Sequence, residues 1–145
     1  MDIELRNYNP EEKAYLWKIY VNALKSYIEE MWGWDQSWQE NRFEESLEKY
    51  KTRLIYYKGT KAGYTQLEKM ENSLDITMLI LEPNFQSIGI GSKILTALQP
   101  KEPRQSLTLN CFQVNKRAYK FYLNCGFQVT KTDEKFIYMQ RQKNV

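Results

Sequence analysis

The sequence predicts a single α/β domain spanning residues 1–145, in which helices pack against one mixed sheet. A length of 145 residues suits one domain. A content of 42% hydrophobic and 27% charged residues is typical of a globular protein with an apolar core. Apolar residues repeat every two positions in some segments and every three or four in others. These changes of period predict the element order β-α-α-β-β-β-α-β-α-β-β.

The N-terminal third predicts one strand followed by two helices. Residues 2–6 alternate between polar and apolar and are expected to form the strand. Asn9 is placed to cap a helix that Gly33 ends, and Ser37 to cap a second helix that runs to Tyr50. A glutamate three residues after each cap could complete a capping box.

The rest of the chain predicts strands interrupted by two helices. The strands are expected at residues 52–58, 64–70, 74–81, 106–112, 127–131 and 135–141, and the helices at 90–98 and 115–124. The segment 74–81 is rich in apolar residues. It is therefore expected in the middle of the sheet, covered on both faces.

The composition excludes several classes of site. The chain has no histidine, which removes Ser-His and Cys-His nucleophile pairs and most zinc sites, so we expect no metal. Cys111 and Cys125 form no C-x-x-C pair, and two free thiols are favoured over a disulfide. A net charge of +3 is too small to predict nucleic-acid binding, but it is compatible with an anionic small molecule.

The hydrophobic segments predict a cytoplasmic protein without a membrane partner. The longest apolar run, Met78 to Leu81, is far too short to span a bilayer. The first ten residues are acidic and polar and lack a signal-peptide core.

A glycine-containing loop lies between the predicted central strand and the next helix. Free backbone N–H groups at a helix N-terminus bind anions, and side chains at Gly89 or Gly91 would hold a phosphate away from them. The loop carries neither G-x-x-x-x-G-K-[ST] nor G-x-G-x-x-G, so common nucleotide loops do not fit. An ordinary strand-to-helix turn is the alternative interpretation of this stretch.

Two motifs together resemble the GCN5-related N-acetyltransferase (GNAT) family. "QSIGIG" at 86–91 is similar to its [QR]-x-x-G-x-[GA] coenzyme A loop, and "NKRAYKFYLNCGF" at 115–127 to its N-x-x-A-x-x-F-Y-x-x-x-G-F segment. The element order extends the resemblance over the whole chain. The resemblance implies acetyl-coenzyme A as cofactor and an N-acetyltransferase that moves the acetyl group to a primary amine of a small acceptor.

The resemblance also implies which residues hold the cofactor. Backbone groups of Leu79, Ile80 and Leu81 would bond the pantetheine arm like an added strand. The pyrophosphate loop would comprise Gln86, Ser87, Ile88, Gly89, Ile90, Gly91 and Ser92. Asn115 would touch the arm, cap its helix, or do both. Many family members have a basic residue where this chain has Ser87 and Ile88, so backbone N–H groups would carry more of the binding, helped by Ser92 and Lys93.

Two residues are expected to carry the chemistry. In the family, the tyrosine matching Tyr122 faces the thioester sulfur, where it can protonate the leaving thiolate. The alternative is a tyrosine that only packs. Asp75 lies eleven residues before Gln86, the offset at which some members place a general base, although others use only ordered water. Glu68 is a weaker candidate for the base.

The acceptor is expected near the connection of the first two helices, "EEMWGWDQSWQE". Its tryptophans, Trp32, Trp34 and Trp38, could stack on a ligand or could simply roof the core. Its acidic residues, Glu29, Glu30 and Asp35, would suit a cationic amine. The family resemblance alone suggests a homodimer. The alternative functions are a catalytically silent coenzyme A-binding or sensor domain of the same fold, or a domain whose glycine loop is only a turn.

Overall fold

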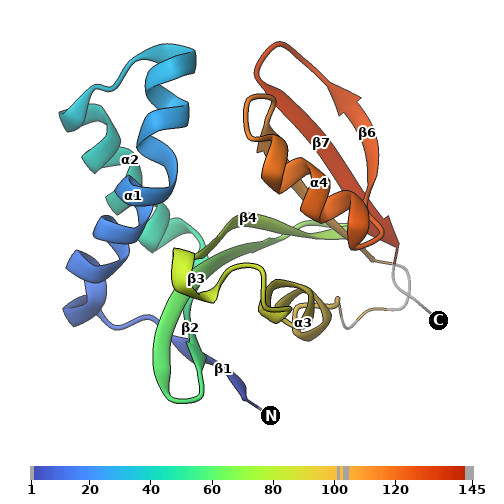
Figure 1. Cartoon of the computed structure of the whole chain (residues 1–145), viewed down its shortest axis with the longest axis horizontal. Helices are drawn as coiled ribbons and strands as arrows, with labels where there is room; N and C mark the ends of the chain where they lie inside the picture. The colour runs from blue at the N-terminus through green and yellow to red at the C-terminus, as the bar shows by residue number, and fades with distance from the viewer. Residues whose placement is uncertain (1, 101, 103–104, 143–145) are drawn as a thin grey trace.

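The computed structural model describes residues 2–100, 102 and 105–142, which form one sheet with helices on both faces (Figure 1). Residues 1 and 143–145, the ends of the predicted domain, lie outside the described part. The predicted element order is confirmed, with two added 3-10 turns, η1 (Pro10–Glu12) and η2 (Pro83–Phe85). The helices are α1 (Lys13–Trp32), α2 (Gln36–Lys49), α3 (Ile90–Ala97) and α4 (Lys116–Asn124). The strands are β1 (Ile3–Asn7), β2 (Lys51–Tyr57), β3 (Thr60–Lys69), β4 (Ser73–Leu81), β5 (Ser106–Phe112), β6 (Gln128–Thr132) and β7 (Phe136–Gln142).

The strands form one sheet in the order β1-β2-β3-β4-β5-β7-β6, so β4 lies in the middle as predicted. Among the described strands, only β4 and β5 pair in parallel, and their register runs from Ser73 opposite Ser106 to Ile76 opposite Leu109. β4 continues to Leu81 without β5 beside it. The two strands therefore separate after Ile76, and β4 keeps a free edge over 77–81.

The two faces of the sheet carry different helices. One core joins α3 and α4 to the sheet through Ile94, Leu95, Leu107, Phe127 and Met139, among others. The other core packs α1 and α2 on the opposite face, over the half made by β2, β3 and β4. Figure 1 shows α1 and α2 at one side of the molecule and α4 beside β7 at the other, with β4 between them.

Local signals explain where the first two helices begin. The Asn9 capping box is confirmed at the start of η1, the turn that leads directly into α1: the Asn9 side chain accepts a bond from Glu11 N, and the Glu12 carboxylate accepts one from Asn9 N. The predicted Ser37 cap is wrong. The cap lies two residues earlier, at Asp35, whose carboxylate accepts a hydrogen bond from Trp38 N at 3.0 Å, so α2 begins at Gln36. Aspartate and serine cap equally well, so the sequence pattern alone did not separate the two positions.

The turn between β2 and β3 is shorter than the predicted five-residue turn at 59–63. β3 already begins at Thr60, since Lys58 and Gly59 both adopt positive φ angles, 50° and 81°, and close the hairpin within two residues. Cys111 and Cys125 are both free thiols. In the described ranges, no helix is both long and apolar enough to cross a membrane.

Candidate functional site

A cleft of about 730 Å³ opens where β4 separates from β5, and we call it the splay cleft. The end of β4, the loop before α3, the inner side of α1 and one side of α4 line it. Most of the predicted site residues meet here: Leu79, Ile80, Leu81, Gln86, Ser87, Gly89, Gly91, Asn115 and Tyr122. The free edge of β4 therefore faces a space that can accept an extended ligand alongside the strand.

The loop before α3 has the backbone expected of an anion site. Gly89 caps α3 with φ +85°, a left-handed conformation that L-residues rarely adopt, and open space surrounds the position where its Cβ would be. Gly91 also lines the cleft, and it has a packing role that the sequence did not indicate. A Cβ at Gly91 would lie 2.7 Å from Cζ of Phe121, so this glycine lets α3 approach α4 closely.

A cation that the sequence reasoning missed stands beside the loop. Arg117, in the first turn of α4, donates a hydrogen bond from Nη2 to Oγ of Ser87 at 2.8 Å, and both residues line the splay cleft. Ser87 has φ +63°, which is unusual for a residue other than glycine. The loop lacks a basic residue of its own, and Arg117 supplies one from thirty positions further along the chain.

Tyr122 is the most enclosed polar side chain of the splay cleft. Its exposed fraction is 9%, and it packs edge-on against Phe127 with ring centroids 5.6 Å apart. Burial, together with the neighbouring thiols of Cys111 and Cys125, raises the pKa of the Tyr122 phenol. The phenol is therefore protonated at neutral pH and can donate a proton or a hydrogen bond to a group in the cleft.

Asn115 and Gln86 both have structural bonds within the site. The Asn115 side chain accepts a hydrogen bond from Ala118 N at 3.1 Å, which makes it the N-cap of α4 as well as a cleft residue. Gln86 donates from Nε2 to the carbonyl of Leu81 at 2.8 Å. Gln86 thus ties the loop back to the end of β4, so its visible role is to position the loop.

Four predicted site residues do not line the splay cleft. Ile90 is buried in the core, and Ile88 is exposed. Ser92 donates its hydroxyl to the carbonyl of Gly89 at 3.1 Å, a bond within its own turn. Asp75 lies on the paired part of β4, before the point where the strands separate.

Asp75 lines a second cavity of about 350 Å³, which we call the sheet groove. Its walls are residues of β3, β4, β5, β6 and β7 and the start of the turn after β3. Thr108 donates its hydroxyl to Oδ1 of Asp75 at 2.6 Å. Burial raises the pKa of the Asp75 carboxyl, Thr108 opposes this rise, and the charge of Glu68 adds to it. Asp75 is therefore partnered and more basic than an aspartate in water.

The three tryptophans have different environments, and none lines either cavity. Trp34 packs against Trp17 and Tyr20 and so roofs the core. Trp32 is 54% exposed but contacts Phe112 and Phe136, which brings the end of α1 to β5 and β7. Trp38 is also exposed, beside the Arg42 guanidinium.

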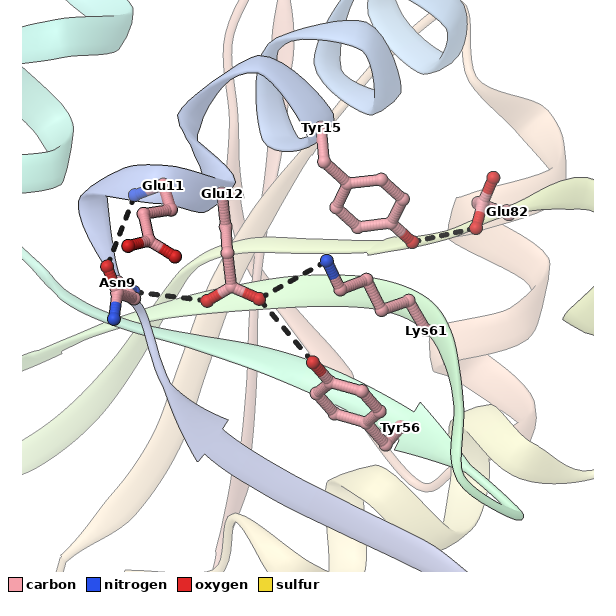
Figure 2. Close-up of polar contacts among 7 residues, drawn as sticks. All are labelled: Asn9, Glu11, Glu12, Tyr15, Tyr56, Lys61 and Glu82. Carbon is pink, nitrogen blue, oxygen red and sulfur yellow. Dashed lines mark hydrogen bonds and ion pairs between the residues drawn. The ribbon is translucent and has the colours of Figure 1, made fainter.

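The far end of the splay cleft is held by polar contacts that sequence reasoning did not reveal. Figure 2 shows the Tyr15 side chain, from α1, pointing to Glu82 just after β4, and the hydroxyl donates to Oε2 of Glu82 at 2.7 Å. Glu12 stands between Lys61 Nζ and the Tyr56 hydroxyl, each 3.4 Å from its Oε2 (Figure 2). These bonds fix the start of α1 to the sheet, and Glu82 lines the cleft.

Comparisons with known proteins agree with the fold. Residues 5–138 match the family model of the acetyltransferase (GNAT) domain. A search of curated proteins gives no match. A solved structure of a PaiA N-acetyltransferase from Thermoplasma acidophilum in complex with coenzyme A aligns with a TM-score of 0.76. It is 19% identical, over 99% of this chain and 100% of that one. An acetyltransferase from Thermus thermophilus also aligns with a TM-score of 0.76, at 15% identity over 97% of each chain. The apo form of YjaB from Escherichia coli aligns with a TM-score of 0.71 at 18% identity over 97% of each chain. At these identities the solved structures establish the fold alone.

Proposed function

The chain belongs to the GNAT acetyltransferase family and is an acetyl-coenzyme A-dependent acetyltransferase, and we propose that it acetylates the primary amine of a small acceptor. The observation that carries this proposal is the position of Tyr122. Its buried, protonated phenol lies in the same cleft as the left-handed Gly89 loop and the free edge of β4.

The residues of the splay cleft fit the parts of the cofactor. Backbone groups of Leu79, Ile80 and Leu81 have no β5 partner and would bond the pantetheine arm. Backbone N–H groups between Gln86 and Gly91 would bond the pyrophosphate at the N-terminus of α3. The Arg117 guanidinium adds a charged donor suited to phosphate, and its bond to Ser87 holds it beside the loop.

Two side chains would move protons. When bound, acetyl-coenzyme A supplies an activated acetyl thioester. The Tyr122 hydroxyl would donate a hydrogen bond or its proton to the departing sulfur. Its raised pKa makes it a weaker acid, so the phenol stays protonated until the thiolate forms. Asp75 would accept the proton of the ammonium acceptor, directly or through a water, since its pKa is raised toward that of a useful base.

Cofactor binding is best tested at Gly89, because the chain offers a matched control. Gly59 has φ +81°, close to the +85° of Gly89, and both have open space where a Cβ would be, but Gly59 lies at the β2–β3 turn outside the cleft. Each valine substitution therefore carries a similar cost of at least about 1–2 kcal/mol for a left-handed residue. We expect Gly89→Val to weaken acetyl-coenzyme A binding at least about tenfold by calorimetry, and Gly59→Val to leave the affinity unchanged.

A turnover assay separates an active acetyltransferase from a catalytically silent coenzyme A-binding domain. A panel of primary amines with acetyl-coenzyme A, followed by detection of the released thiol, should identify at least one acceptor. Tight cofactor binding without turnover of any amine would instead support a silent coenzyme A-binding domain. Equal affinities of the two glycine variants would contradict the assignment of the loop.

A further inference from the structure

We propose that Tyr15 is a positioning residue for the cofactor: its hydroxyl holds the Glu82 carboxylate toward α1 and away from the phosphates of acetyl-coenzyme A. Because this role concerns cofactor binding, it rests on the proposed function, in which the splay cleft holds acetyl-coenzyme A. Tyr15 is not among the described lining residues of the cleft, so it would act only through Glu82.

Glu82 carries a charge that opposes the cofactor. Among the described residues that line the splay cleft it is the only acidic one, whereas Arg117 and Lys120 supply positive charge. It directly follows Leu81, the last residue of β4, and it begins the turn toward the phosphate loop, since Phe85 N donates to its carbonyl at 2.9 Å. A carboxylate that turned into the cleft at this point would repel the pyrophosphate.

The backbone around Glu82 is fixed on both sides. Glu82 N donates to the carbonyl of Ala62, on β3, at 2.8 Å. The carbonyl of Leu81 accepts the Gln86 side chain at 2.8 Å, and Pro83 restricts the chain that follows. The position of the carboxylate therefore depends on its own side-chain contacts rather than on movement of the chain.

The Glu82 carboxylate is held by a neutral donor. In the described part of the chain, the Tyr15 hydroxyl is the only hydrogen-bond donor to it, 2.7 Å from Oε2, and Glu82 forms no ion pair. Lys61 Nζ lies 5.1 Å from the centroid of the Tyr15 ring, but it points to Glu12 rather than to Glu82 (Figure 2). The charge of Glu82 is thus directed by Tyr15 and is not neutralised by a cation.

Tyr15 is suited to this role by its own surroundings. Burial raises the pKa of the Tyr15 phenol, and the hydrogen bond to Glu82 and the charges of Glu82 and Glu12 raise it further. The hydroxyl therefore keeps its proton at neutral pH and remains a donor to the charged carboxylate. A hydrogen bond to an ionised acceptor is stronger than one between neutral groups, which favours a single orientation of Glu82.

The test is calorimetry of coenzyme A with Tyr15→Phe, Glu82→Gln and the double variant. We expect Tyr15→Phe to raise Kd about fivefold, because the released carboxylate can approach the phosphates. Glu82→Gln should bind as tightly as the wild type or more tightly, since its amide oxygen is neutral and can still accept the Tyr15 bond. The double variant should bind like Glu82→Gln, because no charge is left to direct.

This recovery distinguishes positioning from a tether between α1 and the sheet. The double variant lacks the same hydroxyl as Tyr15→Phe, so a tether alone would leave both equally weak. Tyr56→Phe is the matched control: it removes another tyrosine–carboxylate bond at the start of α1, but to Glu12, which is not a described lining residue of the cleft. Its Kd should equal that of the wild type.

Salt provides a second measurement on the same variants. The defect of Tyr15→Phe should largely disappear at about 1 M salt, where the Debye length is about 3 Å. An unchanged Kd in Tyr15→Phe, a double variant as weak as Tyr15→Phe, weaker binding by Glu82→Gln, or a defect that persists at high salt would overturn the inference and leave the proposed function intact. Failure of the wild type to bind coenzyme A would overturn the proposed function, and the inference with it.

Discussion

The splay cleft and the sheet groove are built from the same strand in two different ways. Beyond Ile76, β4 contributes its free backbone edge to the cleft. Before Ile76, it contributes the Asp75 side chain to the groove on the sheet face. The cleft thus depends mainly on backbone conformation and a helix terminus, whereas the groove depends on side chains gathered from five strands.

The two cavities also carry opposite charges. Arg117 and Lys120 line the cleft, which suits phosphates, although Glu82 at its far end is held by Tyr15. Glu68 and Asp75 line the groove, which suits an ammonium. Opposite fields on either side of the separation of β4 and β5 would direct an anionic cofactor and a cationic acceptor to different entrances. Three substitutions test this division of roles.

The largest effect is expected at Tyr122, where the two cavities would cooperate in the reaction. Tyr122→Phe removes one hydroxyl and little volume, so cofactor affinity should barely change. The rate should fall by roughly 10²–10⁴-fold, the usual contribution of a general acid or base. Steady-state kinetics and calorimetry together measure both quantities. Tyr119→Phe, on the same helix but outside the lining of the cleft, is the control, and a full-speed Tyr122→Phe enzyme would remove the acid role.

A smaller effect, on cofactor affinity, is expected at Arg117, which tests whether the positive charge of the splay cleft binds the cofactor. Arg117→Gln should weaken acetyl-coenzyme A binding by about tenfold, because one charge-assisted bond to phosphate is lost. The affinity of the variant should also depend less on salt concentration. Lys116→Gln, an exposed neighbour outside the cleft, should bind like the wild type. An unchanged salt dependence in Arg117→Gln would show that the cation does not reach the cofactor.

The smallest effect is expected at Asp75, and it depends on pH. A raised carboxyl pKa means that Asp75 becomes a charged base only at a higher pH than an aspartate in water. Asp75→Asn should therefore lower the rate most between this raised pKa and the much higher pKa of the amine, and least where the amine is already neutral. Cofactor affinity should stay the same. A pH–rate profile with the wild-type shape and height would indicate that water alone takes the proton.

The sequence could predict the splay cleft because its parts are local. The functional residues of the loop at 86–91 and of the segment at 115–127 are nearly consecutive in the sequence. The periodicity of apolar residues predicts the helices and strands on either side of them. Gly89 and Tyr122 were identified in this way. The roles assigned to these residues remain predictions.

The sequence could not predict contacts that only the fold creates. Arg117 reaches Ser87 from another helix, and Phe121 explains Gly91, but neither pair is close in sequence. The sheet groove joins residues from five strands, so its shape follows from register, which periodicity does not define. The expected acceptor tryptophans illustrate the same limit: their pattern did not distinguish Trp34 in the core from Trp32 against β5 and β7.

The most direct test is a crystal structure of the protein with coenzyme A. We expect the pantetheine arm along residues 79–81 of β4, and the sulfur within hydrogen-bonding distance of the Tyr122 hydroxyl. Coenzyme A bound outside the splay cleft, or with its sulfur directed away from Tyr122, would contradict the proposed site.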